Sequence, residues 1–137
     1  MIYTIYFAKI KSIPDNYVAI AICLKVPTWF NGVSSTLLSP SYSILKQWQN
    51  NHDELSYKRR FVYEILERLD PYETIEGLIK SLPKDIQDKI NSYDYEIYNN
   101  PDFHIVLLCY ESSEKFCHRH IVSKWFRLYG ISCEELK

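Results

Sequence analysis

The residues best suited to chemistry lie in one stretch near the end of the chain, HIVLLCYESSEKFCHRHIVSKWF, from His104 to Phe126. Residues 105–108 form an unbroken apolar run, which predicts a central, buried strand followed by a buried Cys109. A short polar loop follows, and residues 117–120 open an amphipathic helix. Because a helix N-terminus offers free N–H groups and a positive dipole, ligands of α/β proteins often bind at such a strand-to-helix junction. The stretch therefore predicts a functional site.

Two neighbouring residues at the predicted helix start are candidates for ligand contact. Arg119 carries a planar, permanent and bidentate cation, which suits a phosphate or carboxylate group. His118 could donate to a ligand or act as a general base. We expect both side chains to border the main pocket. The alternatives are a surface arginine that pairs with a carboxylate and a histidine packed on the sheet.

Glu111 follows the predicted strand and is the second candidate catalytic residue beside His118. A carboxylate at a strand end can serve as a nucleophile or base, or bind the hydroxyl groups of a ribose. The alternative is a structural carboxylate that caps the helix or forms an ion pair with Arg119.

Cys109 and Cys117 are predicted to line the same ligand site. The pKa of Cys117 is expected to be low, because helix N-termini favour the thiolate. In cysteine phosphatases and rhodaneses, five residues separate a cysteine at a strand end from an arginine. Here Arg119 lies ten positions after Cys109 and two after Cys117, so phosphatase chemistry is not expected.

A metal site is not expected from the sequence, although Cys109, Cys117, His118 and His120 lie close together in it. No C-x2–4-C pair is present, and consecutive residues of a helix point about 100° apart. Cys117 and His118 are therefore not expected to reach one ion together with Cys109. The chain has 3 glycines and contains neither G-x-G-x-x-G nor a Walker A sequence, so no cofactor is expected.

Aromatic residues offer two further surfaces. Trp29 and Phe30 are candidate ligand-binding residues that could form a shelf for a planar group, the alternative being core packing. The chain has 12 tyrosines, and a cluster of them in the middle third could bind a ligand or a protein partner, or be half-buried packing. This cluster comprises Tyr42, Tyr57, Tyr63, Tyr72, Tyr93, Tyr95 and Tyr98.

The pattern along the chain predicts a small single α/β domain over residues 1–137, with a mostly parallel sheet of about three to five strands flanked by helices. Apolar and β-branched runs predict strands at residues 2–8, 17–24 and 104–109. Polar loops are expected at 9–16, 25–40 and 93–101. Helical spacing predicts helices at 41–50, 55–69, 72–82, 84–91 and 117–129, the last with Gly130 as its C-cap.

Composition narrows the class of partner. The net charge is −1, which argues against broad binding to a nucleic-acid backbone. No apolar run approaches the roughly 20 residues that span a membrane, and the N-terminus lacks the apolar core of a signal peptide. Four cysteines without the spacing of a secreted framework indicate reduced thiols and a cytoplasmic protein.

The CYE…FCHRH pattern, residues 109–111 and 116–120, resembles that of the DUF488 family, a bacterial and phage family of unknown function. The segments YTIYFAKIK, PTWFNG, LSPSYSILKQW and LLCYESSEKFCHRHIVSKWF are also similar to that family. The resemblance implies a cytoplasmic single α/β domain and no established reaction.

Two functions remain open at this point. One is a protein that binds or processes a small phosphorylated or nucleotide-like ligand at Glu111, Cys117, His118 and Arg119. The other is a binding module without catalysis, which sequesters a nucleotide signal or binds a protein through its tyrosine-rich middle. Clustering around a pocket favours a ligand, a flat tyrosine patch favours a protein partner, and turnover separates an enzyme from a binding module.

Overall fold

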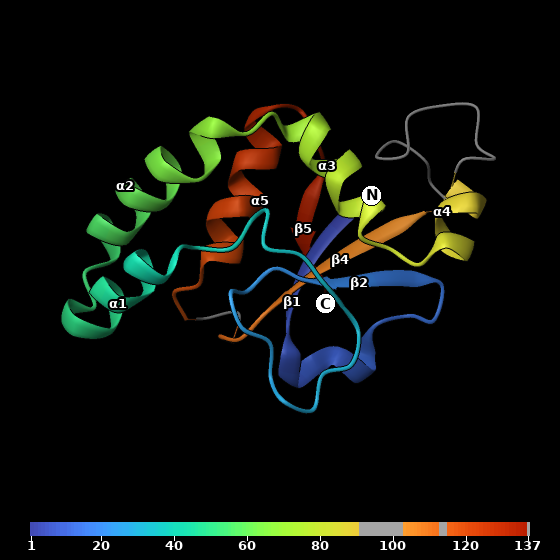
Figure 1. Cartoon of the computed structure of the whole chain (residues 1–137), viewed down its shortest axis with the longest axis horizontal. Coiled ribbons are helices and arrows are strands. Elements are labelled where there is room, and N and C mark those ends of the chain that lie inside the picture. Colours follow the sequence, from blue (N-terminus) through green and yellow to red (C-terminus); the bar gives the residue numbers. More distant parts are fainter. Residues whose placement is uncertain (91–102, 113–114, 137) are drawn as a thin grey trace.

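A parallel sheet is the framework of the computed structural model, which describes residues 1–90, 103–112 and 115–136 (Figure 1). In these residues the five strands pair in the order β3-β2-β4-β1-β5, and every pair is parallel. The strands are β1 (Ile2–Tyr6), β2 (Tyr17–Ala21), β3 (Val33–Ser34), β4 (His104–Cys109) and β5 (Cys133–Glu135). The predicted α/β class with helices flanking a parallel sheet is confirmed.

Helices make the long connections between these strands. Helices α1 (Tyr42–Asn51), α2 (Glu54–Glu64), α3 (Pro71–Lys80) and α4 (Lys84–Ile90) lie between β3 and β4, and α5 (His118–Leu128) leads from β4 to β5. Three of them begin at residues with short polar side chains. Ser41, Asp53 and Asp70 accept hydrogen bonds from first-turn backbone N–H groups of α1, α2 and α3. Such caps satisfy donors that have no partner within the helix.

β4 lies at the centre of the sheet because it pairs with β1 on one side and β2 on the other. Ile105, Val106, Leu107 and Leu108 are all at most 2% exposed, and Cys109 is also buried. The prediction of a central buried strand is confirmed. Its carboxyl end brings Cys109 to the site described below.

The two faces of the sheet have different covers. Ile105 and Leu107 belong to the core shared with α1, α2, α3 and α5, which Figure 1 shows on one side of the strands. Val106 and Leu108 point to the opposite face, which is packed against a 3₁₀ helix, η1 (Phe7–Ser12), and the loop that follows β2. Side chains alternate along a strand, so a strand buried on both faces needs an unbroken apolar run.

Several predicted elements differ in extent from those observed. The first strand ends at Tyr6, because Phe7 turns away to cover the second face of the sheet. The helix predicted over residues 55–69 is divided into α2 and a 3₁₀ turn, η2 (Leu66–Arg68). Leu66 is 1% exposed. The packing of its side chain determines the backbone conformation here, although the helical spacing of the apolar residues predicted a continuous helix.

Two short strands were not predicted, and one predicted loop falls outside the described residues. β3 lies within the loop expected over residues 25–40, and β5 follows α5. Both are edge strands without a long apolar run. The loop predicted at 93–101 is outside the described residues. None of the described helices has both the length and the apolar character that crossing a membrane requires.

Candidate functional site

A cleft of about 410 Å³ opens at the carboxyl ends of β2 and β4. The chain runs from β2 towards β3 at one edge of the sheet and from β4 towards β5 at the other. Connections that diverge from neighbouring strands leave a crevice between them, which is the usual ligand site of open parallel sheets. The cleft walls come from the loops after β2 and β4, from α1 and α2, and from the N-terminus of α5.

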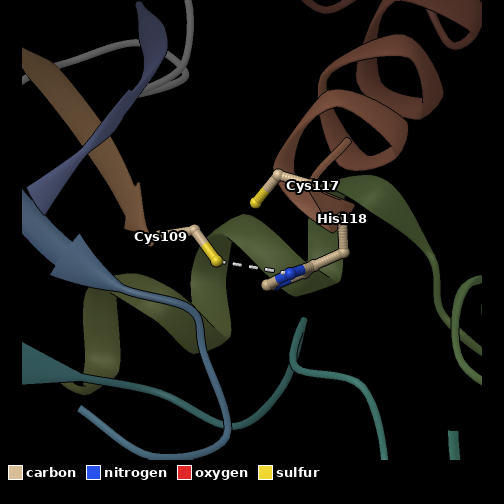
Figure 2. A group of neighbouring side chains, drawn as sticks. All are labelled: Cys109, Cys117 and His118. Carbon is tan, nitrogen blue, oxygen red and sulfur yellow. Dashed lines mark hydrogen bonds between the residues drawn. The ribbon is translucent and has the colours of Figure 1, made fainter. Parts of the chain in front are cut away.

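Cys109, Cys117 and His118 line this cleft, and we call them the cysteine–histidine cluster. Cys109 ends β4, Cys117 is the N-cap residue of α5, and His118 begins that helix. Figure 2 shows the Cys109 sulfur and the His118 ring pointing toward one another, with the Cys117 sulfur beside them. Their sulfur and nitrogen donor atoms all lie within 4.8 Å of one another, and all three residues are buried.

Both ring nitrogens of His118 have partners inside the protein. Nε2 lies 2.9 Å from the backbone oxygen of Ile22, and Nδ1 lies 3.4 Å from Sγ of Cys109. A carbonyl oxygen can only accept, so Nε2 carries a hydrogen and donates it to Ile22. Nδ1 therefore faces the thiols, and neither nitrogen is left to take a proton directly from a ligand. This geometry supports a positioning or coordinating role for His118 rather than that of a general base.

The two thiols of the cluster differ in acidity. The pKa of Cys117 is lowered, first by its side-chain interaction with Cys109 and then by the nearby His118, against the opposing effect of burial. The backbone N–H of Arg119, in the first turn of α5, also lowers the pKa of Cys117. The Cys117 side chain makes no cap hydrogen bond, so we attribute this effect to the field of the helix N-terminus. The same Cys109–Cys117 interaction, together with burial, raises the pKa of Cys109. Cys117 is thus the residue that carries thiolate character.

An aromatic wall stands beside the cluster. Trp48 of α1, Tyr57 of α2 and Phe116 all line the cleft. The ring of Phe116 lies 4.7 Å from that of Trp48 and 5.0 Å from that of Tyr57, measured between centroids. Burial raises the pKa of Tyr57, which is only 6% exposed. The wall offers apolar ring surface to a planar ligand.

Among the described residues, two charged side chains also line the cleft, and both belong to exposed residues. Lys25 follows β2, and Glu111 follows β4. The hydroxyl of Tyr110 donates to the backbone oxygen of Lys25 and so ties the two loops together. The cleft therefore combines a carboxylate, an ammonium group and an aromatic wall above a floor that contains the cluster.

Arg119 does not line the cleft, so the prediction that it borders the main pocket is wrong. Its side chain is fully buried, and its Nε donates to the Glu135 carboxylate at 3.1 and 3.3 Å. Its Nη1 donates to the backbone oxygen of Glu111, and its guanidinium lies over the Tyr6 ring. The expected alternative of a carboxylate partner is correct in kind, but the partner is Glu135 and not the Glu111 side chain.

Trp29 and Phe30 lie outside the lining of this cleft, so their assignment as ligand-binding residues stays a prediction. Phe7 packs against both, with ring centroids at 5.9 Å from Trp29 and 5.3 Å from Phe30. Phe30 contributes to the second face of the sheet, whereas Trp29 is 57% exposed. The core-packing alternative therefore holds for Phe30.

The tyrosine-rich middle divides between the cleft and the surface. Tyr57 lines the cleft, Tyr42 and Tyr63 are exposed on α1 and α2, and Tyr72 donates a hydrogen bond to the backbone oxygen of Tyr129. The remaining members of the set, Tyr93, Tyr95 and Tyr98, lie outside the described residues.

Cys117 and His118 lie close enough to Cys109 to share one ion with it, so the prediction that they could not do so is wrong. Cys117 has φ −154° and ψ 145°, so it is extended and precedes the helix. The 100° rule between consecutive helical residues therefore does not apply to it. His120 is not in the cluster, and its Nδ1 lies 3.6 Å from a Glu135 oxygen instead.

Sequence reasoning missed Cys23, Lys25, Trp48, Tyr57 and Phe116 as parts of one site. Cys23 and Lys25 could have been found, because they follow a parallel strand and the carboxyl ends of parallel strands share one edge. Trp48 and Tyr57 come from helices whose packing on the sheet depends on long-range contacts, for which the sequence carries no signal.

Comparison of the chain with protein-family models, with curated protein sequences and with solved structures gives no match. The resemblance to the DUF488 family stays a prediction, and the functional argument rests on the cleft itself.

Proposed function

We propose that this protein binds a small nucleotide-like, phosphorylated ligand in the cleft between the ends of β2 and β4. One observation carries the proposal: a single cleft at the ligand-binding edge of a parallel sheet combines an aromatic wall with one carboxylate and one ammonium group. A free phosphate would need cations and would gain nothing from aromatic rings. A ligand with a planar base, hydroxyl groups and a phosphate matches all three features.

Each part of the ligand has a partner in this proposal. The base stacks against Trp48 and Phe116, since stacking is sequence-tolerant and favours any π-face. Glu111 accepts hydrogen bonds from sugar hydroxyls, which is how acidic residues hold a ribose. Lys25 pairs with the phosphate at the rim of the cleft.

Catalysis, if the ligand is turned over, depends on Glu111. Among the described residues, Glu111 is the carboxylate that lines the cleft, whereas His118 has both ring nitrogens engaged inside the protein. A binding module without turnover would use the same contacts. Incubation of the protein with its bound ligand, followed by analysis for products, distinguishes the enzyme from the binding module. The free thiols of Cys23, Cys109, Cys117 and Cys133 support a reducing compartment, so we include a cytoplasmic location in the proposal.

Calorimetric titration of the full chain with AMP, GMP, CMP and UMP tests the proposal, with ribose 5-phosphate and inorganic phosphate as reference ligands. At least one nucleotide is expected to bind more tightly than ribose 5-phosphate. Stacking on an aromatic side chain is worth about 1–3 kcal/mol, or roughly five- to a hundred-fold in affinity. Equal affinity for a nucleotide and for ribose 5-phosphate would contradict a role for the aromatic wall.

Two variants separate the polar contacts. Glu111→Gln is expected to weaken every nucleoside and nucleotide by roughly ten-fold or more, because a hydrogen bond to a charged group contributes about 1.5–3 kcal/mol. Lys25→Gln is expected to weaken nucleotides only a few-fold, since an exposed ion pair contributes about 0–1 kcal/mol, and to leave nucleosides unchanged.

Matched controls are available on exposed helix surfaces outside the cleft. Glu76→Gln on α3 and Lys124→Gln on α5 make the same chemical changes away from the ligand. Unchanged nucleotide binding in Glu111→Gln, or equal losses in the control variants, would refute the assignment of these contacts.

A further inference from the structure

We propose that Cys109, Cys117 and His118 form a binding site for one zinc ion whose fourth coordination position faces the cleft. This site goes beyond the proposed function, because an ion held by these three residues needs no nucleotide-like ligand in the cleft. The inference rests on the placement of the donor atoms, the orientation of the His118 ring and the burial of the cluster.

The spacing of the donor atoms fits a tetrahedral ion. Zinc binds sulfur at about 2.3 Å and imidazole nitrogen at about 2.0 Å, which places a sulfur about 3.5 Å from the nitrogen and two sulfurs about 3.8 Å apart. In the structure, Sγ of Cys109 lies 3.4 Å from Nδ1 of His118. The Cys117 sulfur completes a group whose donors are all within 4.8 Å of one another, so small side-chain rotations suffice.

A hydrogen bond fixes the orientation of the His118 ring, as is typical of metal-binding histidines. Zinc-binding histidines almost always donate their second N–H to a carboxylate, a backbone carbonyl or water, which fixes the ring and directs the other nitrogen to the metal. Nε2 of His118 donates to the backbone oxygen of Ile22 at 2.9 Å, and Nδ1 points at the thiols (Figure 2). The protein's own hydrogen bond therefore holds the ring in the orientation that a metal ligand needs.

Donor chemistry selects the kind of ion. Two thiols and one imidazole are soft and borderline ligands, which suit zinc and disfavour magnesium and calcium. Cys117 is the N-cap residue of α5, and the positive end of a helix favours the negative charge that a thiolate ligand carries. All three ligand residues are buried, which limits the oxidation of thiolate ligands.

The site offers three protein ligands and an open position. Within the part of the chain that the structure describes, no other group of three or more cysteine, histidine or carboxylate donors lies as close together. All three ligands line the cleft, so the fourth position is accessible to water or to a molecule in the cleft. Three protein ligands with one open position are typical of catalytic zinc rather than of closed structural zinc.

Cobalt substitution of the reduced, chelator-treated full chain tests the site directly. Co²⁺ is expected to bind with a stoichiometry of one per chain and to give the intense visible d–d bands of tetrahedral cobalt and thiolate-to-cobalt charge-transfer bands in the near ultraviolet. Zn²⁺ is expected to displace it and bleach both sets of bands. Absence of these bands, or a spectrum without thiolate charge transfer, would overturn the proposal.

Single substitutions identify the ligands. Cys109→Ser, Cys117→Ser and His118→Gln are each expected to weaken zinc at least about 100-fold in a competition assay, because even loss of a residue that only orients a ligand costs 10–100-fold. Cys133→Ser is the matched control, since Cys133 is also buried but lies on β5. Zinc affinity that survives both Cys109→Ser and Cys117→Ser would overturn the proposal.

X-ray absorption spectroscopy of the zinc-loaded wild type identifies the ligands without any substitution. It therefore tests the proposal even if one of the variants does not fold. The expected first shell has two sulfurs at about 2.3 Å, one imidazole nitrogen and one further light atom at about 2.0 Å. A shell with a third sulfur, or one of nitrogen and oxygen atoms only, would overturn the proposal. Because zinc binding is measured without nucleotides, its failure is distinguishable from failure of the proposed ligand.

Discussion

Replacement of Arg119 by methionine is expected to destabilise the fold, although this residue was first expected to bind an anion. The Arg119 side chain is 0% exposed and that of Glu135 is 25% exposed. Methionine keeps much of the apolar stem but removes the charge, so the Glu135 carboxylate loses its buried partner. Loss of one member of a buried ion pair costs about 3–5 kcal/mol, and the partial exposure of Glu135 favours the lower end, because water can replace part of the lost interaction.

The melting temperature gives a direct readout of this loss. For a chain of this length, a loss of about 3 kcal/mol lowers the melting temperature by roughly 10–15 °C. Thermal and urea unfolding of wild type and Arg119→Met, followed by circular dichroism without ligand, measures it. A change in unfolding free energy below about 0.5 kcal/mol would refute the structural role of the Arg119–Glu135 pair.

A double-mutant cycle tests the pairing itself. Glu135→Gln leaves the fully buried Arg119 with a neutral acceptor, so a loss at least as large as that of Arg119→Met is expected. The double variant is expected to be more stable than the sum of the two single losses predicts, with a coupling of at least about 1 kcal/mol. Strict additivity would show that the two side chains act independently.

Three further changes test the fold. Leu107→Ala removes a fully buried side chain from the central strand and is expected to cost about 2–5 kcal/mol in urea unfolding. Gly130, which follows α5 with φ +80°, meets no atom within 4 Å of an added Cβ, so Gly130→Ala is expected to cost only the backbone strain of about 1–2 kcal/mol. A hydrogen bond from Arg60 lowers the pKa of Glu64, so the stability advantage of wild type over Glu64→Gln is expected to be complete above the unfolded pKa and to disappear as pH falls through the lower folded pKa.

A specific result would contradict each of these three expectations. A loss below about 1 kcal/mol for Leu107→Ala would contradict close packing at the centre of the sheet. Gly130→Asn, whose side chain tolerates positive φ, is expected to cost less than Gly130→Ala, and the reverse order would contradict the strain argument. A stability difference for Glu64→Gln that does not change at acid pH would contradict the ion pair with Arg60.

The sequence predicted the elements with strong local signals. β4 was predicted with its exact bounds, because a strand buried on both faces must be apolar at every position. The closing helix was also predicted, and Val122, Trp125 and Phe126 on its core-facing side are buried. β5 was not predicted, because three residues at the edge of the sheet carry no periodic pattern and their pairing with β1 is long-range.

Part of the candidate site was also predicted from a local signal in the sequence. Glu111, Cys109, Cys117 and His118 all line the cleft, since they flank one strand-to-helix junction. Helical spacing is informative only inside a helix. His118 and Arg119 are consecutive helical residues, so they face different directions, and Arg119 reaches Glu135 instead of the cleft. Cys117 is extended and precedes the helix, so this rule does not apply to it, and its sulfur lies close to the His118 ring.

The electrostatics of the cleft explain why the phosphate contact that we propose differs from the one expected at the start of α5. The positive end of that helix already faces the Cys117 sulfur, whose thiolate character would repel a second anion. The Arg119 guanidinium is paired with Glu135, so Lys25 is the cation of the described residues that lines the cleft and that we propose for a phosphate. A zinc ion on the two cysteines would cancel the charge of two thiolates and remove that repulsion. The two proposals are therefore independent in their tests but reinforce one another electrostatically: a zinc-loaded cluster favours an anionic or polar ligand atom where the cluster alone disfavours it.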